Sequence, residues 1–331
     1  MKSLDIAGGR QLERARSRRS GVVVETEKTA KTPIPLSPGN VGNADNVVID
    51  GNEKRQGPRP LTTIRPSKGW RIADPREVWK FRGLLAALAI RDIKLRYRQT
   101  ALGVAWVVLQ PLLASGILAF VFGTVAGVTK PGKSSVFIFV LAGFVGWSLF
   151  STTFARAGQS LLQHSMLISK VFFPRIILPA SAVMAALLDA GIGFALFVLL
   201  ALFSGFSFGW PIVSLPIWLG LLAVLAFGLG LISAALAVRF RDVQYITPVF
   251  TQILFYASPV AYQTSAVPEK WRGLFLLNPL APLLDGLRWS LLGENHMNSA
   301  AFLYSAVVAT IVFWLGLLLF HRWEREFADV I

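Results

Sequence analysis

The segment Gly127–Ser134 (GVTKPGKS) matches the phosphate-binding pattern G-x-x-x-x-G-K-[ST] at every position. In nucleotide-binding proteins this loop follows a strand and opens a helix whose N-terminus faces the phosphates. Here a long apolar run stands on each side of the loop, and no apolar run ending in an acidic pair for magnesium is evident. We therefore interpret the match as a turn rich in Gly and Lys. We expect no ATP site, no catalytic residue and no enzyme activity in this chain.

Other reactive side chains are sparse. The sequence has no cysteine, which excludes disulfides and thiol chemistry, and its three histidines (His164, His296 and His321) are far apart. We expect the chain to bind no metal ion and no cofactor. Asp189 is the one formal charge inside a long apolar run. An intramembrane carboxylate faces the bundle interior. Hydrogen bonding between helices is the favoured role of Asp189, with transport or proton coupling as alternatives.

The elements that position these residues are apolar. Of 331 residues, 54% are hydrophobic and 15% charged, and the mean hydropathy is +0.56. Soluble domains carry about 25% charged residues, so an ordinary soluble enzyme is excluded. A helix needs roughly 20 apolar residues to cross a membrane, and only helices pair every backbone amide in such a segment. Six runs predict an all-α polytopic membrane protein with six transmembrane helices: Ala101–Val128, Val136–Phe154, Ile176–Phe203, Leu215–Val238, Ile246–Val260 and Phe302–Phe320.

The fifth of these runs is short and ends near Pro259, and a further apolar stretch, Leu274–Leu284, follows it. This pattern predicts a span followed by re-entrant or interfacial helices. The spans would occupy residues 101–331. Residues 1–74 differ sharply: they hold 14 basic and 8 acidic residues and few large apolar ones. Such a segment is expected to be a disordered basic cytoplasmic tail, and no apolar run of signal-peptide length follows its basic start.

Basic residues also indicate the orientation. The formal net charge is +15. Under the six-span arrangement, 14 of the 19 Lys and Arg residues beyond residue 74 fall on one side. The positive-inside rule places that side, with both termini, in the cytoplasm. This distribution explains most of the positive charge without nucleic acid, so no nucleic-acid partner is expected.

Two polar segments border the spans. Residues 75–100 are predicted to form an N-terminal amphipathic interfacial helix, because Ile90, Ile93 and Tyr97 share one helical face, bordered by Arg91 and Lys94. Residues 159–172 connect the second and third runs and are too apolar for a free linker. Exposed apolar surface of this kind usually marks a protein contact, so this segment is predicted to be a short helix that docks a partner.

Several stretches, in order from about residue 62 to the end, resemble the membrane subunits of ABC-type polysaccharide exporters, the O-antigen and teichoic-acid transport family. The matching stretches are Arg91–Thr100 (RDIKLRYRQT), Leu102–Trp106 (LGVAW), Leu109–Leu112 (LQPL), Lys170–Pro179 (KVFFPRIILP), Arg239–Val243 (RFRDV), Ser258–Val260 (SPV), Val267–Glu269 (VPE), Leu277–Pro279 (LNP) and Phe327–Ile331 (FADVI).

This resemblance implies six spans, with re-entrant helices on the outer side between spans five and six. It further implies a homodimer in a bacterial cytoplasmic (inner) membrane, with the pathway at the dimer interface. It also implies two copies of a separate ATPase subunit, which would hold the ATP and magnesium. The lipid-linked polysaccharide is the implied substrate. Residues 159–172 would then be the coupling helix, and its contacts would come from Leu162, His164, Met166, Leu167, Lys170 and Phe172.

A sliding glycan needs hydrogen-bonding groups for its hydroxyls and aromatic rings for its apolar sugar faces. Residues in or beside spans one and five fit this need, and Pro111 is expected to kink the first span. With Asn278, which the resemblance places at an outer gate, the predicted substrate path is Trp106, Gln110, Pro111, Tyr245, Gln252, Tyr256 and Asn278. The alternatives are an ABC exporter of drugs or peptides, an ion-coupled secondary transporter, or a membrane-embedded glycosyltransferase.

Overall fold

The computed structural model describes residues 75–97, 105–127, 134–171, 173–293, 299–324 and 327. The predicted disordered tail, residues 1–74, lies outside these residues, as do Phe172 and most of the loop that matches the phosphate-binding pattern. Regular structure in the described ranges is helical throughout. The longer helices are α2 (Arg82–Tyr97), α3 (Ala105–Ala119), α4 (Val136–Gln163), α6 (Ile177–Phe203), α7 (Leu215–Arg239), α8 (Val243–Tyr256), α10 (Leu280–Leu292) and α11 (Ser299–Trp323). The shorter ones are α1 (Pro75–Lys80), η1 (Phe120–Val125), α5 (Ser165–Lys170), η2 (Trp210–Ser214), η3 (Thr264–Ala266) and α9 (Glu269–Leu276).

Five helical segments among the described residues are long and apolar enough to cross a membrane: Ala105–Val125, Val136–Gln163, Ile177–Phe203, Trp210–Arg239 and Ser299–Trp323. They match five of the six predicted runs. The exception is the fifth predicted run, Ile246–Val260, most of which lies in α8, a helix of 14 residues. At 1.5 Å per residue such a helix extends about 21 Å, less than the roughly 30 Å of a hydrocarbon core.

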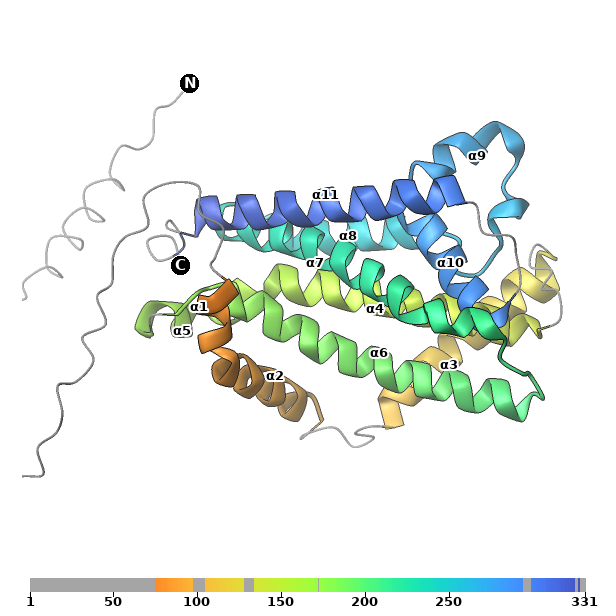
Figure 1. Cartoon of the computed structure of the whole chain (residues 1–331), viewed down its shortest axis with the longest axis horizontal. Coiled ribbons are helices and arrows are strands. Elements are labelled where there is room, and N and C mark those ends of the chain that lie inside the picture. The colour runs from red at the N-terminus through yellow and green to blue at the C-terminus, as the bar shows by residue number, and fades with distance from the viewer. Residues whose placement is uncertain are drawn as a thin grey trace, which may run out of the picture. The chain divides into compact units, whose positions relative to one another are not determined.

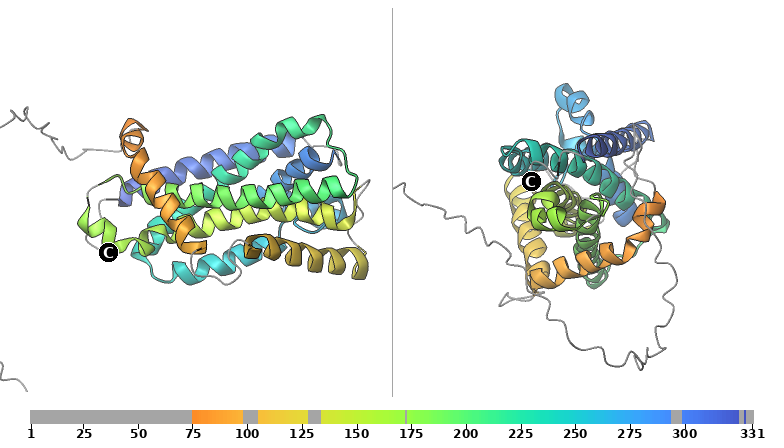
Figure 2. Two further views of the ribbon diagram at one scale, coloured as in Figure 1. Left: turned by 90° about the horizontal axis from the view of Figure 1, so that it is seen from below. Right: turned by 90° about the vertical axis from the view of Figure 1, so that its left-hand side faces the viewer.

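The long helices run side by side (Figure 1). α1, α2, α5 and the end of α11 gather at one end of the bundle, called here the α5 end, and η1, η2, α9 and α10 gather at the other, the α10 end (Figures 1 and 2). α4 is the central helix and packs against α3, α6, α7, α8 and α10, while α7 also packs against α11. Helices buried on several sides need apolar side chains around most of their circumference, which explains the nearly continuous apolar runs.

Two clusters of buried side chains hold the bundle together. The larger joins α4, α6, α7 and α10 through residues such as Phe150, Phe197, Leu222 and Leu287. The smaller lies at the α5 end and joins α2, α4, α5, α7 and α11. Leu88 of α2 is buried in this smaller cluster, whereas Ile90 on the predicted interfacial face is exposed. α2 therefore has one apolar face against the bundle and a second that faces outwards.

Candidate functional site

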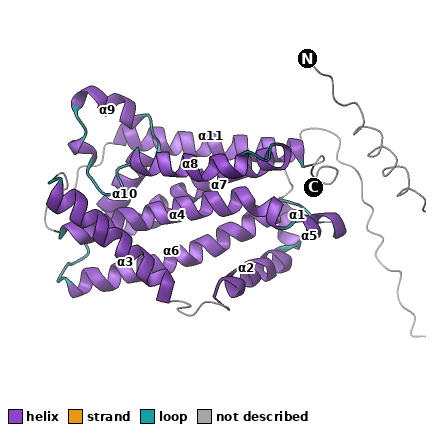
Figure 3. Cartoon of the chain, turned by 180° about the vertical axis from the view of Figure 1, so that it is seen from behind, coloured by secondary structure: helices purple, strands orange, loops and turns teal. Residues whose placement is uncertain are grey.

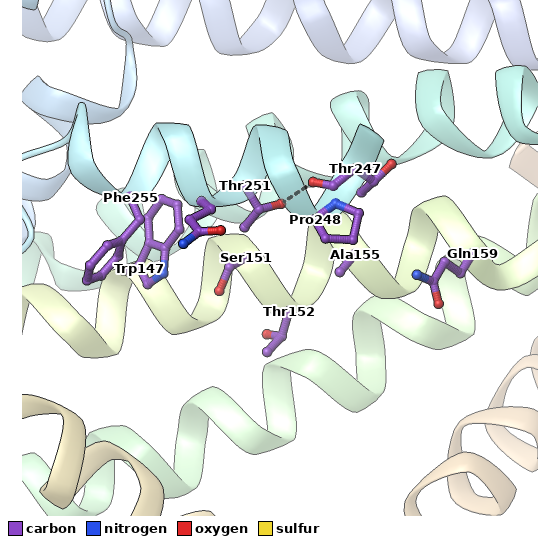
Figure 4. A pocket seen from close by; sticks show the side chains of 10 residues that line it. Trp147, Ser151, Thr152, Ala155, Gln159, Thr247, Pro248, Thr251 and Phe255 are labelled. Carbon is purple, nitrogen blue, oxygen red and sulfur yellow. Dashed lines mark hydrogen bonds between the residues drawn. The ribbon is translucent and has the colours of Figure 1, made fainter. Parts of the chain in front are cut away.

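A groove of about 450 Å³ lies between α4 and α8 (Figure 4). The sequence positions that line it recur every four residues on each helix, which places them on one helical face. All ten lining residues are uncharged: Trp147, Ser151, Thr152, Ala155 and Gln159 from α4, and Thr247, Pro248, Thr251, Gln252 and Phe255 from α8.

The hydroxyl groups in the groove are held by the helix backbone. Thr251 Oγ1 donates to the Thr247 carbonyl at 2.8 Å (Figure 4), and Thr247 Oγ1 donates to the Val243 carbonyl at 2.8 Å. Such bonds to the preceding turn bend helices, and Pro248 removes one backbone donor from the same turn. A threonine oxygen that donates its hydrogen still accepts through its lone pairs. The groove thus offers oriented acceptors as well as the amides of Gln159 and Gln252.

Aromatic rings close the groove towards the α10 end. The ring centroids of Trp147 and Phe255 are 5.3 Å apart at an angle of 64°. Nearer the α5 end, Phe154 packs against Phe250 with centroids 5.9 Å apart. Hydroxyl and amide groups beside aromatic faces form a surface that binds polar rings with apolar faces, such as sugars.

The residues predicted from the sequence to form a substrate path separate into four groups. Gln252 lines the groove, and Gln110 and Pro111 line a smaller cavity of about 90 Å³ between α3, α4 and α6. Trp106, Tyr245 and Tyr256 are exposed on α3 and α8. Asn278 lies outside the groove: its Nδ2 donates to the Ala257 carbonyl at 3.0 Å and to Ser258 Oγ at 2.9 Å.

Several lining residues were missed by the sequence reasoning, among them Ser151, Thr247 and Thr251. The signal that would have found them is polar residues spaced by four within apolar runs.

Asp189, which lines the small cavity, belongs to a charged pair. Asp189 of α6 accepts a hydrogen bond from Arg156 of α4 at 2.6 Å. The expectation that Asp189 is the only charge within a span is wrong. α4 continues to Gln163, beyond the end of the apolar run at Phe154, so Arg156 also lies within a long apolar helix. The contact with Arg156 is a polar contact between helices, the role favoured for Asp189 from the sequence.

The segment predicted to dock a partner comprises the end of α4 and the short helix α5. Met166 is 73% exposed, and Lys170 and Val171 are exposed beside it. Leu167 and Ile168, in contrast, pack into the cluster at the α5 end. The exposed and buried residues therefore lie on opposite sides of α5, and the exposed side forms a small apolar and basic surface.

His164 connects α5 to α2. Its Nδ1 lies 2.8 Å from the Ser160 carbonyl and therefore carries the proton as a donor. Its Nε2 faces the Arg91 guanidinium in hydrogen-bond contact and lies 3.8 Å from Asp92 Oδ1. The turn before α5 is thus fixed to the middle of α2.

Arg288 of α10 was counted from the sequence only as a charge on the outer side. In the structure its side chain is 1% exposed, and its guanidinium lies 4.4 Å from the centroid of the Phe139 ring. The Asp285 carboxylate lies 3.4 Å from the guanidinium. The backbone carbonyls that accept hydrogen bonds from it belong to the segment that follows α8.

A family model described as ABC-2 type transporter matches residues 83–292, which include the groove, α5 and Arg288. The chain belongs to this family. As an ABC-2 permease it is the transmembrane component of an ABC transporter, and its long apolar helices are those of an integral membrane protein. Membership of this family implies an ATPase partner.

Curated relatives of this ABC-2 permease include three with informative names. It is 30% identical over 259 residues to the O-antigen export system permease protein RfbA of Myxococcus xanthus, covering 77% of this chain and 98% of that protein. The RfbA protein of Klebsiella pneumoniae is 27% identical over 257 residues, 75% of this chain and 95% of its own. The polysialic acid transport protein KpsM of Escherichia coli is 25% identical over 244 residues, 72% of this chain and 93% of its own.

Proposed function

We propose that this chain is the membrane subunit of an ATP-driven exporter that moves a lipid-linked, O-antigen-like polysaccharide across the cytoplasmic membrane of a bacterium. The observation that carries the proposal is the groove between α4 and α8, in which uncharged hydroxyl and amide groups lie beside a pair of aromatic rings. The relatives named for O-antigen export and polysialic acid transport support the same class of substrate. Many weak contacts of this kind hold a polymer while allowing it to slide.

The proposed topology has six spans with both termini in the cytoplasm. α8 would act as the fifth span, completed by the segment after it, and α9 and α10 would be re-entrant helices on the outer side. The α5 end would then be cytoplasmic and the α10 end external. The proposed domain organisation is a cytoplasmic tail (1–74), an interfacial helix (75–100) and the permease domain (101–331).

The functional unit in this proposal is a homodimer. α3 and α8 both lie on the face turned towards the viewer in Figure 3 and expose large apolar side chains there. A single copy would leave the polar groove open to lipid, where unpaired polar groups are costly. A second copy that uses the same face would close the two grooves into one channel. Since the chain has no cysteine, single cysteines can test this contact. Crosslinked dimers are expected for Val249→Cys or Ile253→Cys on α8, but not for Leu188→Cys or Leu199→Cys on the exposed side of α6.

Energy would come from two copies of a separate ATPase subunit, which would bind the ATP and magnesium and contact the exposed side of α5. Gly127 follows the π-helical end of a long apolar helix rather than a strand, which supports interpreting the phosphate-loop match as a turn. In proteoliposomes we expect ATP hydrolysis only when the chain is mixed with its ATPase, and Lys133→Ala should not change the rate. Hydrolysis by the isolated chain that Lys133→Ala abolishes would contradict this assignment.

Export of the glycan tests the groove itself. Thr251→Val and Gln252→Leu each remove hydrogen-bonding groups while keeping side-chain size. A net hydrogen bond contributes about 1 kcal/mol, so the rate of glycan export by the reconstituted complex is expected to fall about fivefold for each variant. Leu199→Val, on the exposed side of α6 and outside both the groove and the proposed dimer contact, is the control. Unchanged export in both groove variants would exclude this groove as the substrate path.

A further inference from the structure

The segment between α8 and η3, residues 257–263, contains no regular helix. Backbone outside regular helix has no helical partners for its carbonyl groups. Backbone at membrane depth tolerates such a break only where protein groups pair the exposed carbonyls. The donors that pair these carbonyls come mainly from two side chains, Arg288 and Asn278.

Arg288 bonds three carbonyls of this segment. Its Nη2 donates to the carbonyls of Pro259 and Val260, and its Nη1 donates to the Tyr262 carbonyl at 3.3 Å. The remaining acceptor is Asp285 on its own helix, which also accepts from Thr264 Oγ1. Asn278 adds its bonds to Ala257 and Ser258, and its Oδ1 accepts from the Leu280 amide at 3.0 Å. We call this set of bonds from Arg288 and Asn278 to residues 257–262 the carbonyl clasp.

The central helix α4 accommodates the carbonyl clasp through a missing side chain. A Cβ atom at Gly143 would overlap both the Arg288 guanidinium and the Val260 carbonyl oxygen. One turn earlier, the Phe139 ring packs against the same guanidinium. The segment after α8 is thus fixed to α4 as well as to α10. Tyr262 extends the contact further: its hydroxyl donates to the Tyr256 carbonyl at 3.0 Å, and its ring packs near Phe122 of η1.

We propose that Arg288 is a positioning residue for transport, which holds the α10 end of the groove closed by pinning the segment after α8 to α4. Phe255, whose ring meets Trp147 at that end of the groove, is the second-to-last residue of α8, so the position of the pinned segment sets how closely α8 approaches α4 there. Release of the carbonyl clasp would allow this end of α8 to separate from α4. The inference rests on the proposed function, because it assigns the groove to the substrate path.

The absence of cysteine allows the position of the segment to be measured directly. In Val260→Cys the single thiol replaces a side chain that is 1% exposed, so a water-soluble maleimide should label it slowly in the full permease–ATPase complex in nanodiscs. Adding Arg288→Met should raise the labelling rate by about tenfold or more, because buried charge-assisted hydrogen bonds are lost and the segment opens locally. Gly143→Ala, which keeps the charge but displaces the guanidinium, should have the same effect.

The control is Gly191→Ala in α6, where a Cβ meets nothing within 4 Å. A general packing defect would lower complex assembly and ATP hydrolysis together. For Arg288→Met, the proposal instead expects the rate of glycan export to fall about tenfold, while the rate of ATP hydrolysis stays within about twofold of that of the unsubstituted complex. Arg288→Lys should recover part of the export. The positioning role would be overturned if Val260→Cys were labelled at the same rate with and without the Arg288→Met and Gly143→Ala substitutions. It would also be overturned if these substitutions abolished export while Val260→Cys stayed protected from the maleimide. Failure of the unsubstituted complex to export glycan would instead contradict the proposed function and leave the labelling result to decide the carbonyl clasp alone.

Discussion

Arg156 of α4 and Asp189 of α6 form an ion pair with a nitrogen–oxygen distance of 2.6 Å within two helices long enough to span a membrane. The carboxylate is 11% exposed and borders the small cavity that Gln110 also lines. Charged groups in apolar helices are stable mainly when paired. This pair therefore fixes the position of α4 along α6, which apolar packing alone defines only weakly.

Removal of one partner should cost more than removal of both. Asp189→Asn leaves Arg156 without its counter-charge. We expect the free energy of unfolding to fall by about 1–3 kcal/mol, less than for a fully buried pair, because the guanidinium remains partly solvated. Arg156→Gln should have a similar cost. In the double variant the two changes should be clearly less than additive. A double-mutant cycle measures this from the apparent melting temperatures of the unsubstituted protein, the two single variants and the double variant in one detergent. Strictly additive effects of the two substitutions would show that the ion pair contributes nothing to stability.

The contact between His164 and Arg91 makes a prediction about coupling. It joins α5, the proposed contact of the ATPase, to α2. His164→Leu should leave the ATPase bound but raise the number of ATP molecules hydrolysed per glycan exported, because movement of α5 would no longer carry α2 with it. Gln163→Ala, an adjacent exposed position, serves as the control. An unchanged ratio of hydrolysis to export in His164→Leu would exclude this role.

The two sides of α5 predict opposite consequences for a new charge. Met166→Asp alters the exposed side, so the permease should accumulate normally in the membrane but fail to bind the ATPase in co-purification. Leu167→Asp places a charge in the cluster at the α5 end, and its desolvation should lower the stability of the permease itself by several kcal/mol. Normal ATPase binding by a folded Met166→Asp variant would argue that the ATPase contacts another surface.

Hydropathy was sufficient to predict the long helices, because a run of about 20 apolar residues permits little else. It did not predict where α4 ends. Beyond Phe154 the buried side of that helix continues through Ala157, Ser160 and Leu161, which are small or widely spaced and give a weak apolar signal. Because the predicted run ended at Phe154, Arg156 was not recognised as the partner of Asp189.

The candidate site was predictable only in part. Gln252 was found because a polar residue in an apolar run is conspicuous, whereas Thr247 and Thr251 are only weakly polar. For Arg288, counting charges predicted only the side of the membrane, because such a count does not show the partner of a charge. Its partners are backbone carbonyls of residues 259, 260 and 262, and a sequence does not show which carbonyls a break in a helix exposes.

The close approach of α7 and α11 gives a last prediction, on stability. A Cβ at Gly228 of α7 would lie 2.7 Å from the backbone of Phe313 in α11, and a Cβ at Gly316 would meet the Gly228 carbonyl in return. Small residues at such crossings let helix backbones pack closely in membranes. Gly228→Ala must separate the two helices, and overpacking of this kind costs about 1–3 kcal/mol. The apparent melting temperature in detergent should therefore fall by several degrees. Gly220→Ala, on the same helix where a Cβ meets nothing within 4 Å, should leave it unchanged. Because Ala has a higher helix propensity than Gly, an equal fall in both variants would mean that the contact with α11 does not determine the loss.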